Sequence, residues 1–236
     1  FLLLINNKMK LLKNCLEYFK KSKIIKIIIW IIAIVLILFI GVVIYRIPTV
    51  AEQIKTKEIV ADIHNQKLKI EDVEGKNLPP EPNEKLNDLT LEGIDVNQNG
   101  IRDDVELAIF KLYPDSARIR SGALQYAKSL QMYFRKDITN SETFVAVMQK
   151  NSKGDSCLAQ TVPRVIFPKN ISYEKMDKIA KPSLILMKTR LKEIEKLVFN
   201  TETRKNKQEE NYEKYMTSYG EKPGEDCDID PFILPN

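Results

Sequence analysis

The chain has 236 residues, a formal net charge of +5 and a single histidine, His64. One histidine excludes a zinc site built from several imidazoles, and a Ser-His-Asp or Cys-His catalytic site would have to recruit that residue. The sequence contains no glycine-rich phosphate-binding motif. Aspartate and glutamate are abundant, so a hydrolase that uses paired carboxylates stays open beside proteins that act by binding.

An apolar segment near the N-terminus has the length of a membrane anchor. Residues 27–45 are nineteen consecutive residues without a charge, and as a helix they would span a bilayer core of about 30 Å. The segment is longer than the roughly 7–15 apolar residues of a signal peptide, and the best cleavage site after it, at Ala51, is poor. The sequence therefore predicts an uncleaved transmembrane helix in contact with the lipid bilayer.

The distribution of charge predicts the orientation of this anchor. Residues 1–26, in which Met9 is the expected initiator, are rich in lysine, and the positive-inside rule places them in the cytoplasm. Of 37 basic and 32 acidic residues, eight and one lie in 1–46, which leaves 29 and 31 for 47–236. The external part is nearly neutral, so the net charge does not indicate nucleic-acid binding. The Lys- and Ile-rich composition favours a bacterial inner membrane with a periplasmic domain.

Residues 46–92 are expected to form an extended stalk. A short helix over 52–65 and a strand-like alternation over 67–73 are predicted within it. Residues 77–83, Asn-Leu-Pro-Pro-Glu-Pro-Asn, indicate a stiff linker with polyproline character. The remaining residues, 93–236, are expected to form a small helical extracytoplasmic domain around a single core.

The segment 95–106 combines residue types and spacing that specify a chemistry. Its sequence is Asp-Val-Asn-Gln-Asn-Gly-Ile-Arg-Asp-Asp-Val-Glu, with oxygen-bearing side chains at positions 1, 3, 5, 9 and 12 and glycine at position 6. A calcium ion takes six to eight oxygen ligands, which here would converge from alternate residues of one tight turn. The isoleucine at position 7 would contribute only its carbonyl oxygen. The predicted metal ligands are Asp95, Asn97, Asn99, Ile101, Asp103 and Glu106.

These twelve residues resemble an EF-hand loop, and they resemble the calcium repeat of thrombospondin type 3, D-x-D-x-D-G-I-x-D-x-x-E/D, still more closely. The resemblance implies a bound Ca²⁺. Asn97 and Asn99 replace aspartates, and the lower ligand charge implies weaker binding. Position 8 is Arg102, whereas an EF-hand has an apolar residue there that pairs with a second loop, so a solitary site is expected. The alternative is a solvated acidic turn that caps a helix.

Downstream of this loop, the spacing of apolar residues predicts helices. The first follows directly on the loop and ends at Tyr113, because the next residue is a proline, which disfavours helix in the residue before it. A second is expected over 115–136, and later helices begin after the expected caps Asn140, Ser172 and Thr201.

Glycines and prolines set the expected ends of these helices. Gly154 is predicted to break the third helix, Pro182 to interrupt the fourth, and Gly220 to follow the last. The clearest apolar stripe lies on the fourth helix, and its regular spacing indicates core or a helix–helix contact rather than a cofactor site. Its members are Leu184, Met187, Leu191, Ile194 and Val198.

The cysteines fit the predicted topology. Cys15 lies on the expected cytoplasmic side, where thiols stay reduced, whereas Cys157 and Cys227 lie outside, where disulfides persist. A Cys157–Cys227 disulfide is therefore predicted, and the alternative is a pair of free buried thiols. Asp226, Asp228 and Asp230 alternate around the second cysteine, and a solvated acidic tail is favoured for them over metal ligation or a contact patch.

The sequence thus predicts a mostly α-helical, single-pass membrane protein with a calcium-binding extracytoplasmic domain. Its expected role is that of a binding or structural module of the envelope, with an unidentified envelope protein as partner. The alternative is a carboxylate-dependent hydrolase. Two carboxylates with strongly shifted pKa values in a deep cleft would favour the enzyme. A flat surface patch of Tyr212, Tyr215 and Tyr219 would favour binding, because aromatic side chains anchor interfaces.

Overall fold

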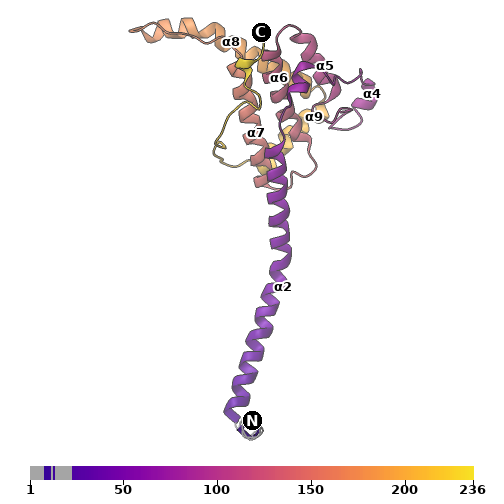
Figure 1. Ribbon diagram of the computed structural model, residues 1–236, viewed down its shortest axis with the longest axis vertical. Helices are drawn as coiled ribbons and strands as arrows, with labels where there is room; N and C mark the ends of the chain where they lie inside the picture. The colour runs from indigo at the N-terminus through magenta and orange to yellow at the C-terminus, as the bar shows by residue number, and fades with distance from the viewer. Residues whose placement is uncertain (1–7, 12, 14–22) are drawn as a thin grey trace. The chain divides into compact units, whose positions relative to one another are not determined.

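The computed structural model describes residues 8–11, 13 and 23–236, which consist of helices and irregular connections (Figure 1). These described residues contain no strand, so the mostly helical fold class is confirmed. The chain divides into two compact units, residues 1–55 and residues 56–236. Most of the expected basic segment 1–26, including Cys15, lies outside the described residues.

The predicted membrane anchor is part of helix α2 (Lys23–Asn65). Within the described part of the chain, α2 is the one helix long and apolar enough to cross a membrane. Its large apolar side chains from Ile27 to Ile47 are exposed, and a helix that is apolar on every side is typical of a membrane span. At 1.5 Å per residue, the uncharged stretch 27–45 is about 28 Å long, close to the thickness of a bilayer core.

The expected extended stalk over 46–92 is wrong from Thr56 onward. Residues from Thr56 onward belong to the second unit, and Ile63, Leu68 and Val73 are between 0% and 4% exposed in its hydrophobic core. The strand-like segment 67–73 also differs from expectation, because the chain turns there into the short helix α3 (Ile70–Glu74). The packing of a few apolar side chains in the core therefore outweighs the weak alternation of apolar and polar residues that predicted a strand.

Helix α6 (Ala117–Gln131) lies at the centre of the second unit and packs along α7 (Ser141–Gln160). As predicted, the Asn140 side chain caps α7, accepting a hydrogen bond from the Thr143 backbone N–H at 3.0 Å. The predicted break at Gly154 is wrong, because α7 runs through it. A Cβ atom at Gly154 would lie 3.0 Å from Tyr126 Cα on α6. This glycine therefore permits close approach of two helices and does not end one.

Helices α4 (Glu84–Asn87), α5 (Asp103–Leu112) and α9 (Glu202–Tyr215) and two short 3-10 turns also belong to the second unit. Helix α5 ends where it was predicted to end, whereas α9 stops well before Gly220. Helix α4 follows the proline-rich segment. The 3-10 turns are η1 (Met132–Phe134) and η2 (Pro231–Ile233).

Two tyrosines of α9 face the core and do not form the surface patch that would favour a binding role. The hydroxyl groups of Tyr212 and Tyr133 are 3.0 Å apart. The Tyr212 ring packs edge-on against Phe144 with centroids 5.4 Å apart, and Tyr215 also contacts Phe144. These aromatic side chains therefore stabilise the interior, where such pairs add to the effect of burial.

Helix α8 (Tyr173–Val198) is buried only in its last turns. Ile194 and Val198 of the predicted stripe lie in the core, whereas Leu184 is 46% exposed. The predicted interruption at Pro182 is wrong, because α8 continues through it. Proline removes one helical N–H donor, but this part of the helix is exposed, so water can hydrogen-bond the carbonyl of Lys178 that loses its partner.

The predicted disulfide between Cys157 and Cys227 is present, with the two Cα atoms 5.0 Å apart. It holds the C-terminal segment against α7. The expected solvated acidic tail is wrong, because Asp228 accepts a hydrogen bond from the Leu68 backbone N–H at 2.9 Å and lies 3.6 Å from Lys150 Nζ. Asp226 accepts a hydrogen bond from Gln160, and Asp230 caps η2.

Candidate calcium loop

Residues 88–102 connect α4 to α5, and the last part of this connection, 95–102, is a tight turn whose side-chain oxygens accept hydrogen bonds from its own backbone. The Asp95 carboxylate accepts hydrogen bonds from the backbone N–H groups of Asn99 at 3.2 Å and Gly100 at 2.8 Å. The Asn99 side-chain oxygen accepts another from Ile101 N–H at 2.8 Å. Gly100 has φ +84°, a left-handed conformation that glycine adopts without steric cost. The loop therefore has the sharp turn that the sequence predicts at position 6.

The first turn of α5 carries the other two carboxylates of the predicted ligand set. Asp103 is 0% exposed and Glu106 is 1% exposed. Asp103 accepts a hydrogen bond from Val96 N–H at 3.0 Å, and Glu106 accepts one from the Asn97 side-chain amide at 3.0 Å. These bonds fold the loop back onto the start of the helix, so that residues from both ends of the predicted site meet.

Burial shifts the ionisation of both helix carboxylates. Loss of solvation raises the pKa of Glu106 to about 7, and the neighbouring carboxylates Asp72 and Asp103 add to the rise. The pKa of Asp103 is also raised by burial and by Asp95 and Asp104. In the folded protein, these groups are difficult to ionise without a nearby cation.

The present arrangement is a hydrogen-bonded turn and not a closed coordination sphere. The described residues contain no group of three or more Asp, Glu, His and Cys side chains close enough to hold a metal ion. The Asn97 amide presents its nitrogen to Glu106, whereas calcium takes oxygen ligands only. The Asn99 amide nitrogen is buried, and this amide also interacts with Glu106. Rotation of both amides would exchange these nitrogens for oxygens.

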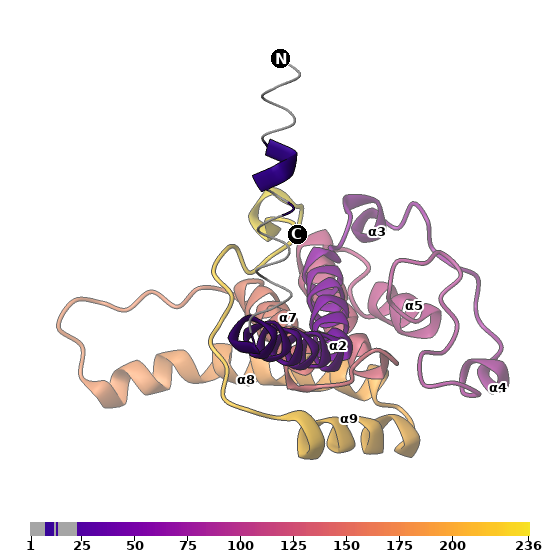
Figure 2. The same cartoon turned by 90° about the horizontal axis from the view of Figure 1, so that it is seen from below.

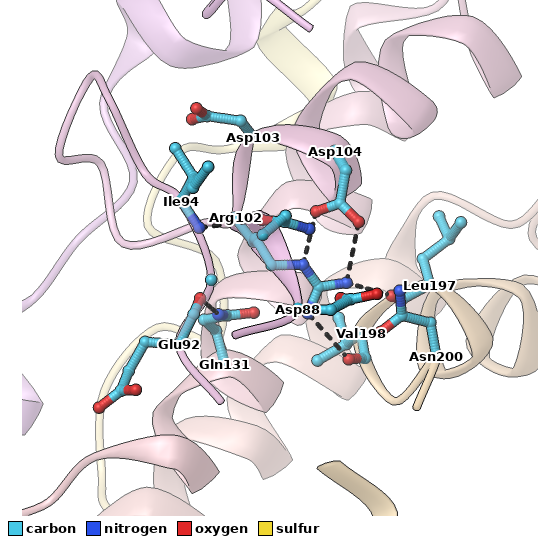
Figure 3. A network of polar contacts seen from close by, with 12 residues as sticks. Asp88, Glu92, Ile94, Arg102, Asp103, Asp104, Gln131, Leu197, Val198 and Asn200 are labelled. Carbon is cyan, nitrogen blue, oxygen red and sulfur yellow. Dashed lines mark hydrogen bonds and ion pairs between the residues drawn. The ribbon is translucent and has the colours of Figure 1, made fainter. Parts of the chain in front are cut away.

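Arg102, at loop position 8, has a role that the sequence does not reveal. Its side chain is fully buried, and Figure 3 shows its guanidinium between Asp104 and the end of α8. It donates hydrogen bonds to the carbonyl oxygens of Leu197 at 2.7 Å and Val198 at 3.2 Å, and its Nε lies 2.5 Å from Asp104 Oδ1. A positive charge at the C-terminal end of a helix is favourable. Arg102 therefore fixes the exit of the loop to α8.

A second buried arginine fixes the entrance of the loop. Arg204 on α9 is 1% exposed. It donates to the backbone carbonyl groups of Asn87 at 2.8 Å and Leu91 at 3.0 Å, and to Asp88 Oδ1 at 2.6 Å. The only sequence signal for Arg102 is a charged residue at loop position 8, where an EF-hand has an apolar one, and no local pattern marks Arg204.

A polar cavity of about 640 Å³ adjoins the loop. Asn97 and Asn99 line it together with basic side chains that include Lys128. Asp103 and Glu106, the loop carboxylates with raised pKa values, are not among its lining residues. Glu71 and Asp72 also line the cavity, so it contains carboxylates, but not the loop pair whose pKa values are raised.

Comparison with known proteins adds no relative from which a function could be transferred. No protein-family model matches the chain, and neither the curated proteins nor the solved structures contain a significant match to it.

Proposed function

We propose that this protein is a single-pass membrane protein whose helical extracytoplasmic domain is a binding or structural module of the cell envelope, stabilised by one Ca²⁺ ion. The main support for the proposed calcium ion is the burial of Asp103 and Glu106 beside a loop whose residues have the spacing of calcium ligands. Two buried carboxylates that meet mainly amide groups and other carboxylates lack a counter-charge, and a divalent cation supplies one.

In the calcium-bound form, the Asn97 and Asn99 amides rotate so that their oxygens face the ion. The Ile101 carbonyl provides the remaining protein ligand beside the carboxylates. Two neutral amide ligands and a solitary loop place the dissociation constant near the 10⁻⁴–10⁻³ M of extracellular modules, far above that of intracellular sensors. Affinity of this order suits a compartment with abundant calcium.

The role of the ion is structural in this proposal. Arg204 holds the entrance of the loop and Arg102 its exit, so the ion orders a short segment between two fixed points. A loop fixed in this way has little freedom to act as a switch. Calcium therefore stabilises the packing of residues 87–106 against α8 and α9.

The disulfide supports an extracytoplasmic location for the second unit, because disulfides persist in oxidising compartments. The lysine-rich N-terminus favours a cytoplasmic start and a bacterial inner membrane. A reporter that is active only in the periplasm, fused after Asn236, should be active in cells. A cytoplasm-only reporter that is active at the same position would reverse this orientation.

A binding role is favoured over hydrolysis. The lone histidine, His64, lies on α2 outside the loop, and burial lowers its pKa. The loop carboxylates with raised pKa values do not line the adjoining cavity. The partner in this proposal is an unidentified envelope protein, and co-purification from membranes is the experiment that would identify it.

Thermal unfolding of the full chain in nanodiscs tests the structural role of calcium. The midpoint should be higher in about 10 mM calcium than in chelator. Binding to the folded state alone would then stabilise it by roughly 1.4–2.7 kcal/mol, for a ten- to hundredfold excess over Kd. Glu106→Gln should lose most of this rise, whereas Glu71→Gln, an exposed carboxylate nearby, should retain it. Equal midpoints with and without calcium would contradict the proposal.

A further inference from the structure

The first part of α8 and the loop before it form an exposed arm, defined here as residues 163–189. The arm extends away from the rest of the second unit (Figures 1 and 2). Tyr173 is 83% exposed and Ile166 is 86% exposed, and the other exposed apolar side chains of the arm include Met176, Ile179, Leu184 and Leu186. This concentration of exposed apolar side chains is unusual for a segment without a partner.

Several apolar side chains of the arm continue the helical stripe that packs in the core, whereas Ile166, Ile179 and Leu186 lie outside it. Positions 173, 176, 180, 184 and 187 follow the spacing of three and four residues that continues to Ile194 and Val198, which are fully buried. Most helical stability in proteins comes from packing of an apolar face and not from intrinsic propensity. The arm therefore needs a surface to cover its stripe.

The arm is also where positive charge collects. It contains six basic residues and two acidic ones, whereas the rest of 47–236 contains 23 basic and 29 acidic residues. The basic residues are all exposed, and none of them forms an ion pair within the described part of the chain. They are Arg164, Lys169, Lys175, Lys178, Lys181 and Lys188.

We propose that the arm binds the anionic lipid surface of the membrane in which α2 is anchored. A basic helix with an apolar face and aromatic residues lies in the headgroup region with its apolar face toward the acyl chains. Phe167 and Tyr173 supply the aromatic side chains, and the lysines neutralise lipid phosphates. A second copy of the chain fits less well, because pairing of two arms brings like charges together.

The anchor keeps the arm close to lipid. Ten residues, 46–55, separate the uncharged stretch from the second unit along the sequence. Even a fully extended chain of that length keeps Thr56 within about 40 Å of the bilayer. The inference rests on the membrane anchor of the proposed function and is independent of the calcium site.

The test uses the full chain with Cys15→Ser, one copy per nanodisc, and an environment-sensitive fluorophore at Tyr173→Cys. Leu89→Cys is the matched control, because Leu89 is 75% exposed and lies outside the arm. In discs with about a third phosphatidylglycerol, the Tyr173 probe should shift to shorter wavelength and be quenched several-fold more by spin-labelled lipid than the Leu89 probe. Discs of phosphatidylcholine alone should reduce the difference.

Charge variants sharpen the experiment. Replacing Lys175, Lys178 and Lys181 together by Glu should abolish the shift, and replacing them by Arg should preserve it. A Tyr173 probe that stays as exposed to water as the Leu89 probe in anionic discs would overturn the proposal. An emission shift of the Tyr173 probe that appears only with two copies per disc would also overturn it. A shift of the same size in anionic and in neutral discs would do the same. Failure of the chain to remain in discs would overturn the anchor itself.

Discussion

The guanidinium of Arg102 donates a hydrogen bond of 2.7 Å to the carbonyl oxygen of Leu197. This contact joins the residue before α5 to the last turn of α8, which lies 95 residues further along the chain. Because the guanidinium is fully buried and also pairs with Asp104, its removal would leave the Leu197 and Val198 carbonyls and one carboxylate without their partner.

Arg102→Met should therefore lower the free energy of unfolding by about 3–5 kcal/mol, the usual effect of breaking a buried ionic contact. Arg102→Lys should lose part of this, because an ammonium group cannot reproduce the forked hydrogen bonds. Urea unfolding of the full chain, followed by circular dichroism, measures both. Arg164→Met, at an exposed position, is the control and should change little; an equal effect of both methionine variants would contradict the assigned role.

Gly154 provides a test of how α6 and α7 pack. A Cβ there would lie 2.7 Å from Ser129 Oγ and 3.0 Å from Tyr126 Cα, so Gly154→Ala should destabilise the domain by about 1–3 kcal/mol despite the better helix propensity of alanine. A Cβ at Gly220 would meet no other part of the protein within 4 Å, and Gly220→Ala should leave the thermal midpoint nearly unchanged. A stabilising Gly154→Ala would show that the helices separate easily.

The local features of the fold are those that the sequence predicts well. Asn140 and Thr201 cap helices where expected, and Cys157 and Cys227, the two cysteines that follow the apolar segment in the sequence, form the predicted disulfide. The start of α5 follows from the loop pattern. The two caps and the start of α5 depend on neighbouring residues, and the disulfide follows from the small number of cysteines. None of these features requires knowledge of the tertiary arrangement.

Features that depend on distant contacts could not be predicted. Arg102 and Arg204 bind backbone carbonyl groups about 100 residues away, and no local pattern marks such partners. Gly154 and Pro182 resemble helix breakers. In the structure, Gly154 lies inside α7 because α6 approaches too closely there for a larger residue. Pro182 lies inside α8 at an exposed position, where water can hydrogen-bond the carbonyl group that loses its partner. Residues 56–92 pack through a few separated apolar side chains, a signal too sparse to distinguish them from a stalk.

Removal of the Cys157–Cys227 disulfide should lower the stability of the protein and loosen the C-terminal segment in particular. Cys157 and Cys227 close a loop with a sequence separation of 70, and the double variant to Ser should lose about 4 kcal/mol in the chain-entropy model. The Leu68 amide, which donates to Asp228, should exchange its hydrogen much faster. Reductant should destabilise the natural chain but not the double variant. Identical exchange at Leu68 in both proteins would show that the tail stays docked without the bond.

Calcium-free stability should fall as the pH rises through the titration of Glu106. Burial raises its pKa from the usual 4.5 to about 7, so the folded state binds its proton more tightly than the unfolded state does. Its contribution is therefore complete below pH 4.5 and is lost as the pH approaches 7. Glu106→Gln should remove this dependence in chelator, as measured by urea midpoints. Saturating calcium should also flatten it, since the ion holds the carboxylate ionised.

The central claim is most directly tested by calorimetric titration of calcium into the full chain in nanodiscs. One ion should bind per chain with Kd of order 10⁻⁴–10⁻³ M. Glu106→Gln should abolish this binding, while Glu71→Gln should retain it. No binding to the natural chain at millimolar calcium, or equal binding to the Glu106→Gln variant, would contradict the calcium site and leave residues 95–106 as an acidic turn at the start of α5.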